Sequence, residues 1–288
     1  MTRSLEVHRR GGRSGVLLVH GLTGTPTEMS FVARGLHEAG FTVHAVQLAG
    51  HCGDVADLLA TGWQDWYASV EAAASRLRED VDHLFVAGLS MGALLALELA
   101  IQRPQLVDGL GLYGTTFRYD GWTIPAVARL SFLLPIACSL GWGKKRLFME
   151  SWPYGIKNER IRQFIVARMQ GGDSGAAGLA GNPLPSLAQF VRLSRRVQRR
   201  LGQVRAPCLV VHSTHDDIAG LGNVELIEKR VSARIEKVLL ADSYHMVSVD
   251  QQRDVVIERS ARFFRQIAGA GAAGLTPRPE PAPASARE

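Results

Sequence analysis

Cysteine is scarce in this sequence, and no apolar leader precedes the rest of the chain. Only three cysteines occur among 288 residues, Cys52, Cys138 and Cys208, and no two of them form a C-x-x-C pair. That number and spacing exclude a disulfide framework, a zinc ribbon and a dithiol redox centre. The first ten residues include Arg3, Glu6, Arg9 and Arg10 and lack the apolar run of a secretory signal. We therefore expect the protein to be cytoplasmic.

The sequence also lacks an uninterrupted apolar run long enough to cross a membrane. A spanning helix needs about 20 consecutive apolar residues. The most apolar stretch, from Trp122 to Trp142, is interrupted by Pro125, Arg129 and Pro135. We therefore expect no stable membrane insertion.

Acidic residues are missing from one segment that is rich in arginine. The net charge is +6, and the segment from Arg192 to Arg205 contains six arginines and no acid, which leaves 27 basic and 27 acidic residues elsewhere. Helical spacing places five of these arginines on one face. That stripe is either a solvated helix face or a site for an acidic partner or a phosphate-bearing substrate. Because no recognition motif accompanies it, no nucleic-acid partner is expected. The five residues are Arg192, Arg195, Arg196, Arg199 and Arg200.

Short apolar runs alternate with longer helical patterns along most of the chain. This alternation predicts an α/β protein with a mainly parallel central sheet and helices on both faces. The predicted strands are 16–19, 42–46, 84–87, 106–112, 208–211 and 235–240. The predicted helices are 26–39, 63–79, 91–102, 223–230 and 248–267.

The alternation is interrupted after Tyr113 and resumes near Pro207. We interpret residues 1–113 and 201–268 as the core, and residues 114–200 as an inserted, mostly helical cap. The glycine-rich stretch 171–183 within the cap is expected to act as a hinge. The final stretch, 269–288, consists mainly of Gly, Ala and Pro and is expected to be disordered.

The motif GLSMG, residues 88–92, lies between a predicted strand and a predicted helix. In this context a G-x-S-x-G motif is typical of a nucleophile at a sharp turn, which makes Ser90 the candidate nucleophile. An ordinary βα turn is the alternative. The backbone N–H of Met91, at the start of the helix, would be one oxyanion donor. A second apolar strand is followed by His20, Gly21 and Leu22, and the N–H of Leu22 is the second candidate donor, while His20 is expected to be structural.

A serine nucleophile also needs a general base and an acid that orients the base. Asp216 and Asp217 follow one predicted strand, and His245 follows the next. Sites in open α/β sheets gather at the carboxyl ends of strands. Spacing alone leaves Asp216 and Asp217 as competing acids, and leaves His245 either catalytic or on the surface.

Six strings make this chain resemble the bacterial carboxylesterase and monoacylglycerol lipase-like branch of the α/β-hydrolase family. In order they are HGLTGTPTEM, LAGHCG, WQDWYAS, GLSMG, THDDI and SYHMVSVD, and the likeness runs from about Val16 to Phe264. The resemblance implies an α/β-hydrolase fold, Asp216 as the acid and His245 as the base. The chain departs from the usual pattern at Cys52 and Ala93, neither of which is a catalytic group.

Together these features predict a serine carboxylesterase that acts on esters of short to medium acyl chains through an acyl-enzyme. An acyl-thioesterase and a non-catalytic binding protein are the alternatives. No cofactor is expected, and His51 and Asp54 are too few to predict a metal site. The cap is expected to line an acyl pocket with some of its large apolar residues. These are Trp122, Phe132, Leu133, Leu134 and Trp142.

Overall fold

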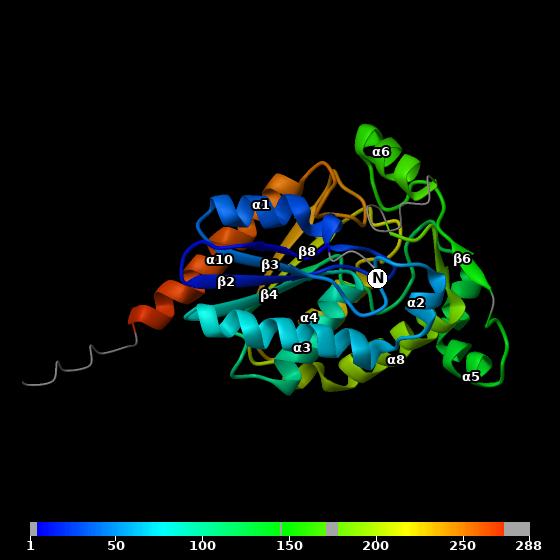
Figure 1. Cartoon of the computed structure of the whole chain (residues 1–288), viewed down its shortest axis with the longest axis horizontal. Helices are drawn as coiled ribbons and strands as arrows, with labels where there is room; N and C mark the ends of the chain where they lie inside the picture. The colour runs from blue at the N-terminus through cyan, green and yellow to red at the C-terminus, as the bar shows by residue number, and fades with distance from the viewer. Residues whose placement is uncertain (1–4, 145, 171–177, 274–288) are drawn as a thin grey trace, which may run out of the picture.

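A seven-stranded sheet forms the centre of the computed structural model, which describes residues 5–144, 146–170 and 178–273 (Figure 1). The strand order is β1-β3-β2-β4-β5-β8-β9, and every neighbouring pair is parallel except β1 with β3. The mainly parallel sheet is therefore confirmed. The antiparallel edge strand β1 was not predicted, because it is only three residues long and largely exposed. The strands are β1 Val7–Arg9, β2 Ser14–Val19, β3 Thr42–Val46, β4 His83–Leu89, β5 Gly109–Tyr113, β8 Cys208–Ser213 and β9 Ile235–Leu240.

Helices cover both faces of this sheet (Figure 1). Helices α3, α4 and α8 pack on one face, and α1 and α10 pack on the other. The central strands are buried from both sides, which explains why they are continuous aliphatic runs rather than alternating ones. The helices of the core are η1 Pro26–Met29, α1 Ser30–Glu38, α2 Val55–Leu59, α3 Trp63–Asp80, α4 Met91–Gln102, α9 Gly222–Arg230 and α10 Arg253–Ala273.

Helix α10 extends further than expected. It continues through Ala273, so the prediction of disorder was wrong for residues 269–273. The Gly, Ala and Pro content of the stretch pointed to disorder, but the alanines in its first residues are strong helix formers. Residues 274–288 lie outside the described residues.

The inserted segment consists of short elements. The apolar stretch that begins at Trp122 is divided between η2 and α5, and no helix in the described ranges is both long and apolar enough to span a bilayer. The antiparallel pair β6 and β7 was not predicted. Of the expected hinge, residues 171–177 lie outside the described residues, and β7 occupies its end. The elements are η2 Ala126–Leu133, α5 Leu134–Ser139, β6 Leu147–Met149, α6 Glu159–Gln170, β7 Gly181–Pro183, α8 Leu184–Arg200 and η3 Leu201–Gln203. The boundary of the cap at residue 200 stays a prediction. Helix α8, which ends there, contacts the core helices α3 and α4 as well as the cap helix α5.

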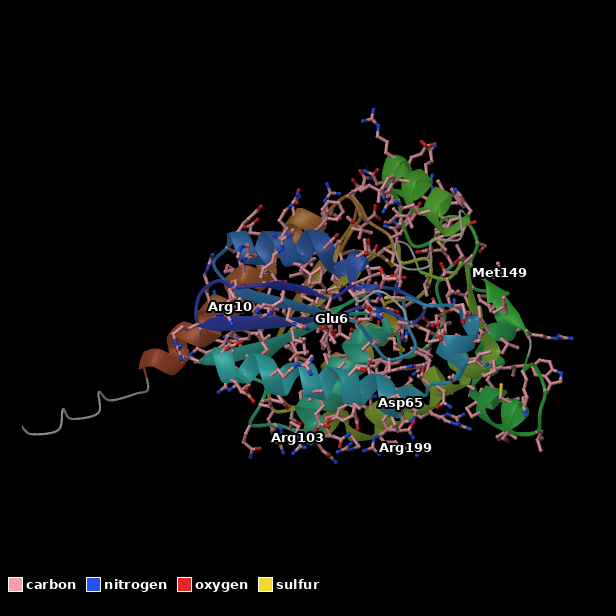
Figure 2. The ribbon with its side chains drawn as sticks, viewed as in Figure 1. Glu6, Arg10, Asp65, Arg103, Met149 and Arg199 are labelled. Carbon is pink, nitrogen blue, oxygen red and sulfur yellow. The ribbon has the colours of Figure 1, made fainter. Side chains whose placement is uncertain are left out.

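Helix α8 carries the arginine stripe, and two of its five arginines face the core. Arg196 Nε and Arg200 Nη1 donate to the same carboxylate oxygen of Glu98, at 2.6 Å and 3.0 Å, and the Glu98 side chain is fully buried on α4. Arg195 donates to the Phe132 carbonyl, whereas Arg199 points away from the molecule (Figure 2). The stripe is therefore not one free anion-binding surface.

Removing both arginine charges should destabilise the protein, because the buried carboxylate of Glu98 would lose its ionic partners. We predict that Arg196→Met with Arg200→Met lowers the free energy of unfolding by about 3 kcal/mol in urea denaturation. The control Arg199→Met, on the exposed side of the same helix, should change it by less than about 0.5 kcal/mol. Equal losses in the two variants would mean that the Glu98 contacts do not stabilise the fold.

Candidate active site

Ser90 occupies a strained turn between β4 and α4. Its φ of 55° and ψ of −114° are rare for a residue with a side chain. The flanking glycines make the turn possible, because a Cβ on Gly92 would collide with the Val19 carbonyl oxygen and a Cβ on Gly88 would collide with the backbone of Gly92. The Ser90 N–H donates to the Tyr113 carbonyl at 2.8 Å. The turn therefore holds the serine at the carboxyl edge of the sheet.

Asp216 and His245 meet at the same edge, from the loops that follow β8 and β9. His245 Nδ1 lies 2.8 Å and 3.0 Å from the two carboxylate oxygens of Asp216. The same carboxylate accepts from the N–H groups of Ile218 and Ala219, at 2.9 Å and 2.7 Å. These contacts fix the carboxylate, and the carboxylate orients the imidazole ring.

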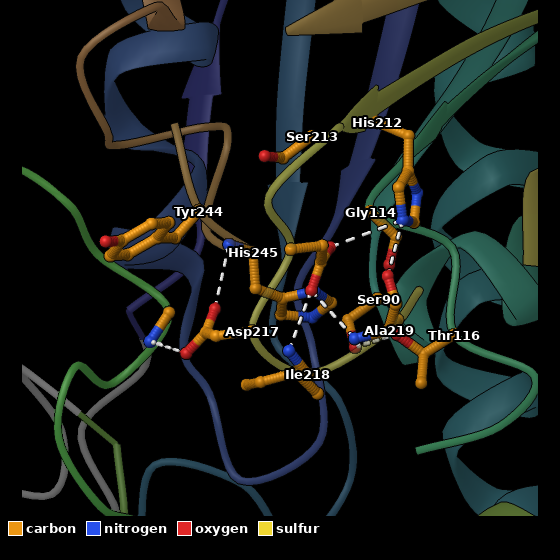
Figure 3. Close-up of polar contacts among 12 residues, drawn as sticks. Ser90, Gly114, Thr116, His212, Ser213, Asp217, Ile218, Ala219, Tyr244 and His245 are labelled. Atoms are coloured by element: carbon orange, nitrogen blue, oxygen red, sulfur yellow. Dashed lines mark hydrogen bonds and ion pairs between the residues drawn. The ribbon is translucent and has the colours of Figure 1, made fainter. Parts of the chain in front are cut away.

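Asp217 has a different place. Its carboxylate accepts from the backbone N–H of His245 at 3.2 Å and from the N–H of Gly155 at 3.0 Å (Figure 3). It therefore positions the two loops and makes no hydrogen bond to the imidazole. The structure brings Asp216, rather than Asp217, onto the ring of His245.

The hydroxyl of Ser90 contacts a residue that the sequence analysis missed. Its Oγ lies 3.1 Å from Thr116 Oγ1, and the Thr116 hydroxyl also lies within hydrogen-bond distance of the Gly114 carbonyl, at 3.0 Å. Gly114 has a φ of 49°, and a Cβ there would lie 3.3 Å from His245 Cε1. The Gly-Thr-Thr sequence after β5 ends at this same edge, which was the available signal. In this structure Ser90 is thus hydrogen-bonded to Thr116 rather than to the imidazole.

A second histidine, also missed, supports the acid. His212 Nε2 donates to the Ala219 carbonyl at 2.7 Å and lies 3.4 Å from Asp216 Oδ2. Burial lowers the pKa of His212, so it stays neutral at physiological pH. Burial raises the pKa of Asp216, but His245 and His212 more than offset this and the pKa is lowered. Burial lowers the pKa of His245, yet Asp216, Asp217 and Glu150 outweigh it and the pKa is raised.

The loop after β2 lies beside Ser90. The N–H of Gly24 donates to the Gly21 carbonyl at 3.3 Å, so Leu22 occupies the second position of a turn, where the turn needs no bond from its N–H. The N–H of Met91 lies in the first turn of α4, where the helix supplies no acceptor. Both N–H groups can therefore donate a hydrogen bond to an acceptor atom of a ligand.

His20 anchors this loop from below. Its Nδ1 donates to the Gly21 carbonyl at 2.9 Å, and its Nε2 accepts from the Leu48 N–H at 3.3 Å. Burial, with the neighbouring His51, lowers the pKa of His20 to about 3. Because the His20 ring stays neutral and both of its nitrogens are hydrogen-bonded to the backbone, its role is structural, as expected.

A cavity of about 1190 Å³ opens beside Ser90, Leu22 and His245. Its walls are mainly apolar, and the expectation that the cap contributes to them is confirmed for Leu133, Leu134 and Trp142. Two other expected residues, Trp122 and Phe132, are not among the lining residues. Trp122 Nε1 donates instead to the His215 carbonyl at 3.1 Å.

Two glutamates lie in this apolar cavity. Glu28 Oε2 accepts from the Gly21 N–H at 3.2 Å, and Glu150 Oε1 accepts from Asn182 at 3.3 Å. Burial raises the pKa of Glu28 to about 8 and that of Glu150 to about 7. No sequence signal linked these residues, because they lie far apart along the chain and come near one another only in the folded structure.

Several known proteins are similar in sequence to this chain over most of its length. The family model described as serine aminopeptidase, S33, matches residues 12–252. The thermostable monoacylglycerol lipase of Bacillus sp. (strain H-257) is 32% identical over 263 residues, which cover 91% of this chain and 94% of the lipase. The carboxylesterase of Bacillus subtilis (strain 168) is 22% identical over 260 residues, which cover 90% of this chain and 95% of the esterase.

Solved structures agree with these likenesses. One structure from work on two metagenome-derived lipolytic enzymes, LipS and LipT, has a TM-score of 0.74 and 28% identity, and covers 91% of this chain and 97% of its own. The monoacylglycerol lipase of Paleococcus ferrophilus has a TM-score of 0.72 at 15% identity, with 91% and 98% covered. At that identity the second structure supports the fold alone.

The raised pKa of Glu28 should make stability depend on pH. A carboxyl whose folded pKa is about 8 against an ordinary 4.5 binds its proton more tightly in the folded state, so stability is lost as pH rises between these values. We predict that Glu28→Gln, which cannot ionise, gains stability relative to wild type from about pH 5 to about pH 8 in urea titrations.

Glu38→Gln, an exposed glutamate on α1, is the matched control and should follow the wild-type curve at every pH. If the Glu28→Gln and wild-type curves ran parallel over this range, Glu28 would titrate normally and this account of it would be wrong.

Proposed function

Because the chain belongs to the serine aminopeptidase S33 family and has the α/β-hydrolase fold, we propose that its ester hydrolysis uses Ser90 as the nucleophile. The protein is an ester hydrolase of the lipase and esterase branch. In this proposal His245 is the general base, Asp216 orients it, and the N–H groups of Leu22 and Met91 form the oxyanion hole.

One observation supports this proposal above the others. The strained serine, the imidazole that is paired with a carboxylate, and Leu22 all border one mainly apolar cavity, and Met91 directly follows the serine at the start of α4. A nucleophile needs a base within reach, a base needs an orienting group, and the developing oxyanion needs preorganised donors. A protein that only binds a ligand needs neither the base, nor the orienting group, nor the oxyanion donors in this arrangement.

The reaction proceeds in two halves. Ser90 Oγ attacks the ester carbonyl carbon while its proton passes to His245, and the negative charge moves to the carbonyl oxygen, facing the Leu22 and Met91 amides. Collapse breaks the bond to the alcohol, which takes the proton from His245 and leaves an acyl-enzyme. Water, deprotonated by His245, then attacks the acyl carbon, and Ser90 recovers its proton as the acid departs. Before the first step the Ser90 hydroxyl has to turn from Thr116 toward the imidazole.

The mainly apolar cavity supports the short to medium acyl chains proposed as substrates, since each buried methylene contributes about 0.8 kcal/mol. A thioesterase acting on acyl-CoA or acyl-carrier protein depended on the arginine stripe as a phosphate site. Arg196 and Arg200 are instead paired with Glu98, so the stripe gives no support to that alternative. The three cysteines are unpaired, which is consistent with the proposed cytoplasmic location.

Several serines line the cavity, and the proposal assigns the role of nucleophile to Ser90 alone. We predict that Ser90→Ala lowers kcat for p-nitrophenyl butyrate by at least about 10⁴, since removing the nucleophile removes the acyl-enzyme route. Ser131→Ala changes another serine that lines the same cavity, and it should leave the rate within about threefold of wild type. Comparable losses in both variants would remove Ser90 from the role of nucleophile.

The two neighbouring aspartates should differ sharply in kinetics. Asp216→Asn should lower kcat by about 10⁴, because an amide in that place favours the wrong tautomer of His245. Asp217→Asn should cost much less in kcat, since Asp217 bonds only backbone N–H groups. It should also shift the acid limb of the kcat/KM profile to lower pH, because one carboxylate that raises the pKa of His245 is lost. An unshifted limb with a loss equal to that of Asp216→Asn would reverse the assignment.

A further inference from the structure

The hydroxyl proton of Ser90 points to Thr116, and the hydrogen bonds around Thr116 show why (Figure 3). The Thr116 hydroxyl has one proton and two oxygen neighbours, the Gly114 carbonyl at 3.0 Å and Ser90 Oγ at 3.1 Å. Gly114 is buried and its carbonyl can only accept, so the Thr116 proton is donated to that carbonyl. Ser90 is therefore the donor in the remaining contact, and Thr116 Oγ1 is the acceptor.

Thr116 is held firmly in this position. It is fully buried, and its β-branched side chain has few rotamers. Hydrogen bonds fix the backbone on both sides of it, because the Gly114 N–H donates to the Val211 carbonyl at 2.9 Å and the Phe117 N–H donates to Asn223 Oδ1 at 2.8 Å. A fixed acceptor beside the nucleophile competes with the general base for the proton of the serine.

The contact acts differently on the two protonation states of His245. Its Nδ1 faces Asp216, so Nε2 is the nitrogen left for Ser90. When the ring is neutral, Nε2 and Thr116 Oγ1 compete for the one proton of the serine. When the ring is protonated, Nε2 is a donor, and Ser90 can accept from it while its own proton stays on Thr116. The Thr116 hydroxyl therefore favours the imidazolium and disfavours the state in which Ser90 can give its proton to the base.

We propose that Thr116 is a positioning residue, which holds the Ser90 hydroxyl in a resting orientation until the hydroxyl turns to the base. The bond to Thr116 is lost during attack, because the serine proton then passes to His245 and Ser90 Oγ bonds to the acyl carbon. An interaction that is present in the ground state and absent in the transition state lowers kcat. This kinetic effect rests on the proposed function, whereas the hydrogen bond is a property of the free protein.

The first measurement is the pKa of His245 in the free protein, and it needs no substrate. It is followed by an NMR titration of the histidine rings, with the resonance assigned by its loss in His245→Gln. Thr116→Val replaces the hydroxyl by a methyl group and should lower the pKa of His245, because the imidazolium loses its support and the neutral ring gains the serine proton. The other titratable groups around the ring are unchanged in this variant. They are Asp216, Asp217, Glu150, Glu28 and His212.

The second measurement is the rate at which a fluorophosphonate labels Ser90, at a pH where the imidazole is neutral. Thr116→Val should raise the second-order rate constant about fivefold, the effect of one hydrogen bond of ordinary net strength. The kcat for p-nitrophenyl butyrate should rise by a similar factor with little change in KM, because the contact belongs to the serine and not to the substrate.

Three further variants separate this role from a role in folding. Thr116→Ser keeps both hydrogen bonds and should restore the wild-type pKa and labelling rate. Thr116→Cys keeps a donor toward the Gly114 carbonyl but is a weak acceptor, so it should behave like Thr116→Val even if the valine variant folds poorly. Thr115→Val is the matched control. Thr115 is buried beside Thr116, and its hydroxyl has no hydrogen-bond partner in the part of the chain that the structure describes, so both measurements should stay at the wild-type values.

Two results would overturn the proposal. One is an unchanged pKa of His245 in both Thr116→Val and Thr116→Cys. The other is slower labelling in these variants with full activity in Thr116→Ser, because Thr116 would then hold Ser90 ready to attack. A failure of the proposed function looks different. In that case the wild type is not labelled at Ser90, while Thr116→Val still lowers the pKa of His245 and so supports the resting contact.

Discussion

The close packing of α4 against the end of β2 determines the conformation of Ser90 and the position of the loop beside it. Only hydrogen atoms fit at Gly88 and Gly92, so the chain can turn sharply from β4 into α4 and hold Ser90 at a positive φ. That conformation is unfavourable for a serine by about 1–3 kcal/mol and persists because the buried strands and α4 leave no alternative. The same packing brings the loop after β2 beside the serine. The position of the nucleophile and that of its oxyanion donors are thus one consequence of helix-to-strand packing.

The electrostatics of the site follow from burial. Asp216 stays ionised although it is buried, because two backbone amides, His245 and His212 surround it, and its charge in turn raises the pKa of His245. For Glu28 and Glu150 burial outweighs the nearby charge of His245, so the pKa of Glu28 is raised to about 8 and that of Glu150 to about 7. Carboxyl groups within one small region therefore hold different charges at the same pH.

Local sequence patterns predicted most of the core strands and helices and the turn that carries the nucleophile. The aliphatic strands, the long helices and the G-x-S-x-G turn are each encoded within a few residues, and the predicted bounds of β3, α4 and β9 coincide with those in the structure. What the pattern did not reveal depends on contacts between distant segments. Thr116 reaches Ser90, His212 reaches Asp216, and Glu98 pairs with the arginines of α8 only after the chain has folded. The arginine spacing indicated a helix face but could not show that a buried carboxylate lay beneath it.

Covalent labelling by a fluorophosphonate, read by peptide mass spectrometry, tests the central claim most directly. The account requires that the strained serine is the activated group, so a single phosphonyl adduct per chain should form on the peptide that carries Ser90. Esterase activity should fall in proportion to that adduct. Full inactivation with the adduct on another residue, or full labelling of Ser90 with activity retained, would contradict the account.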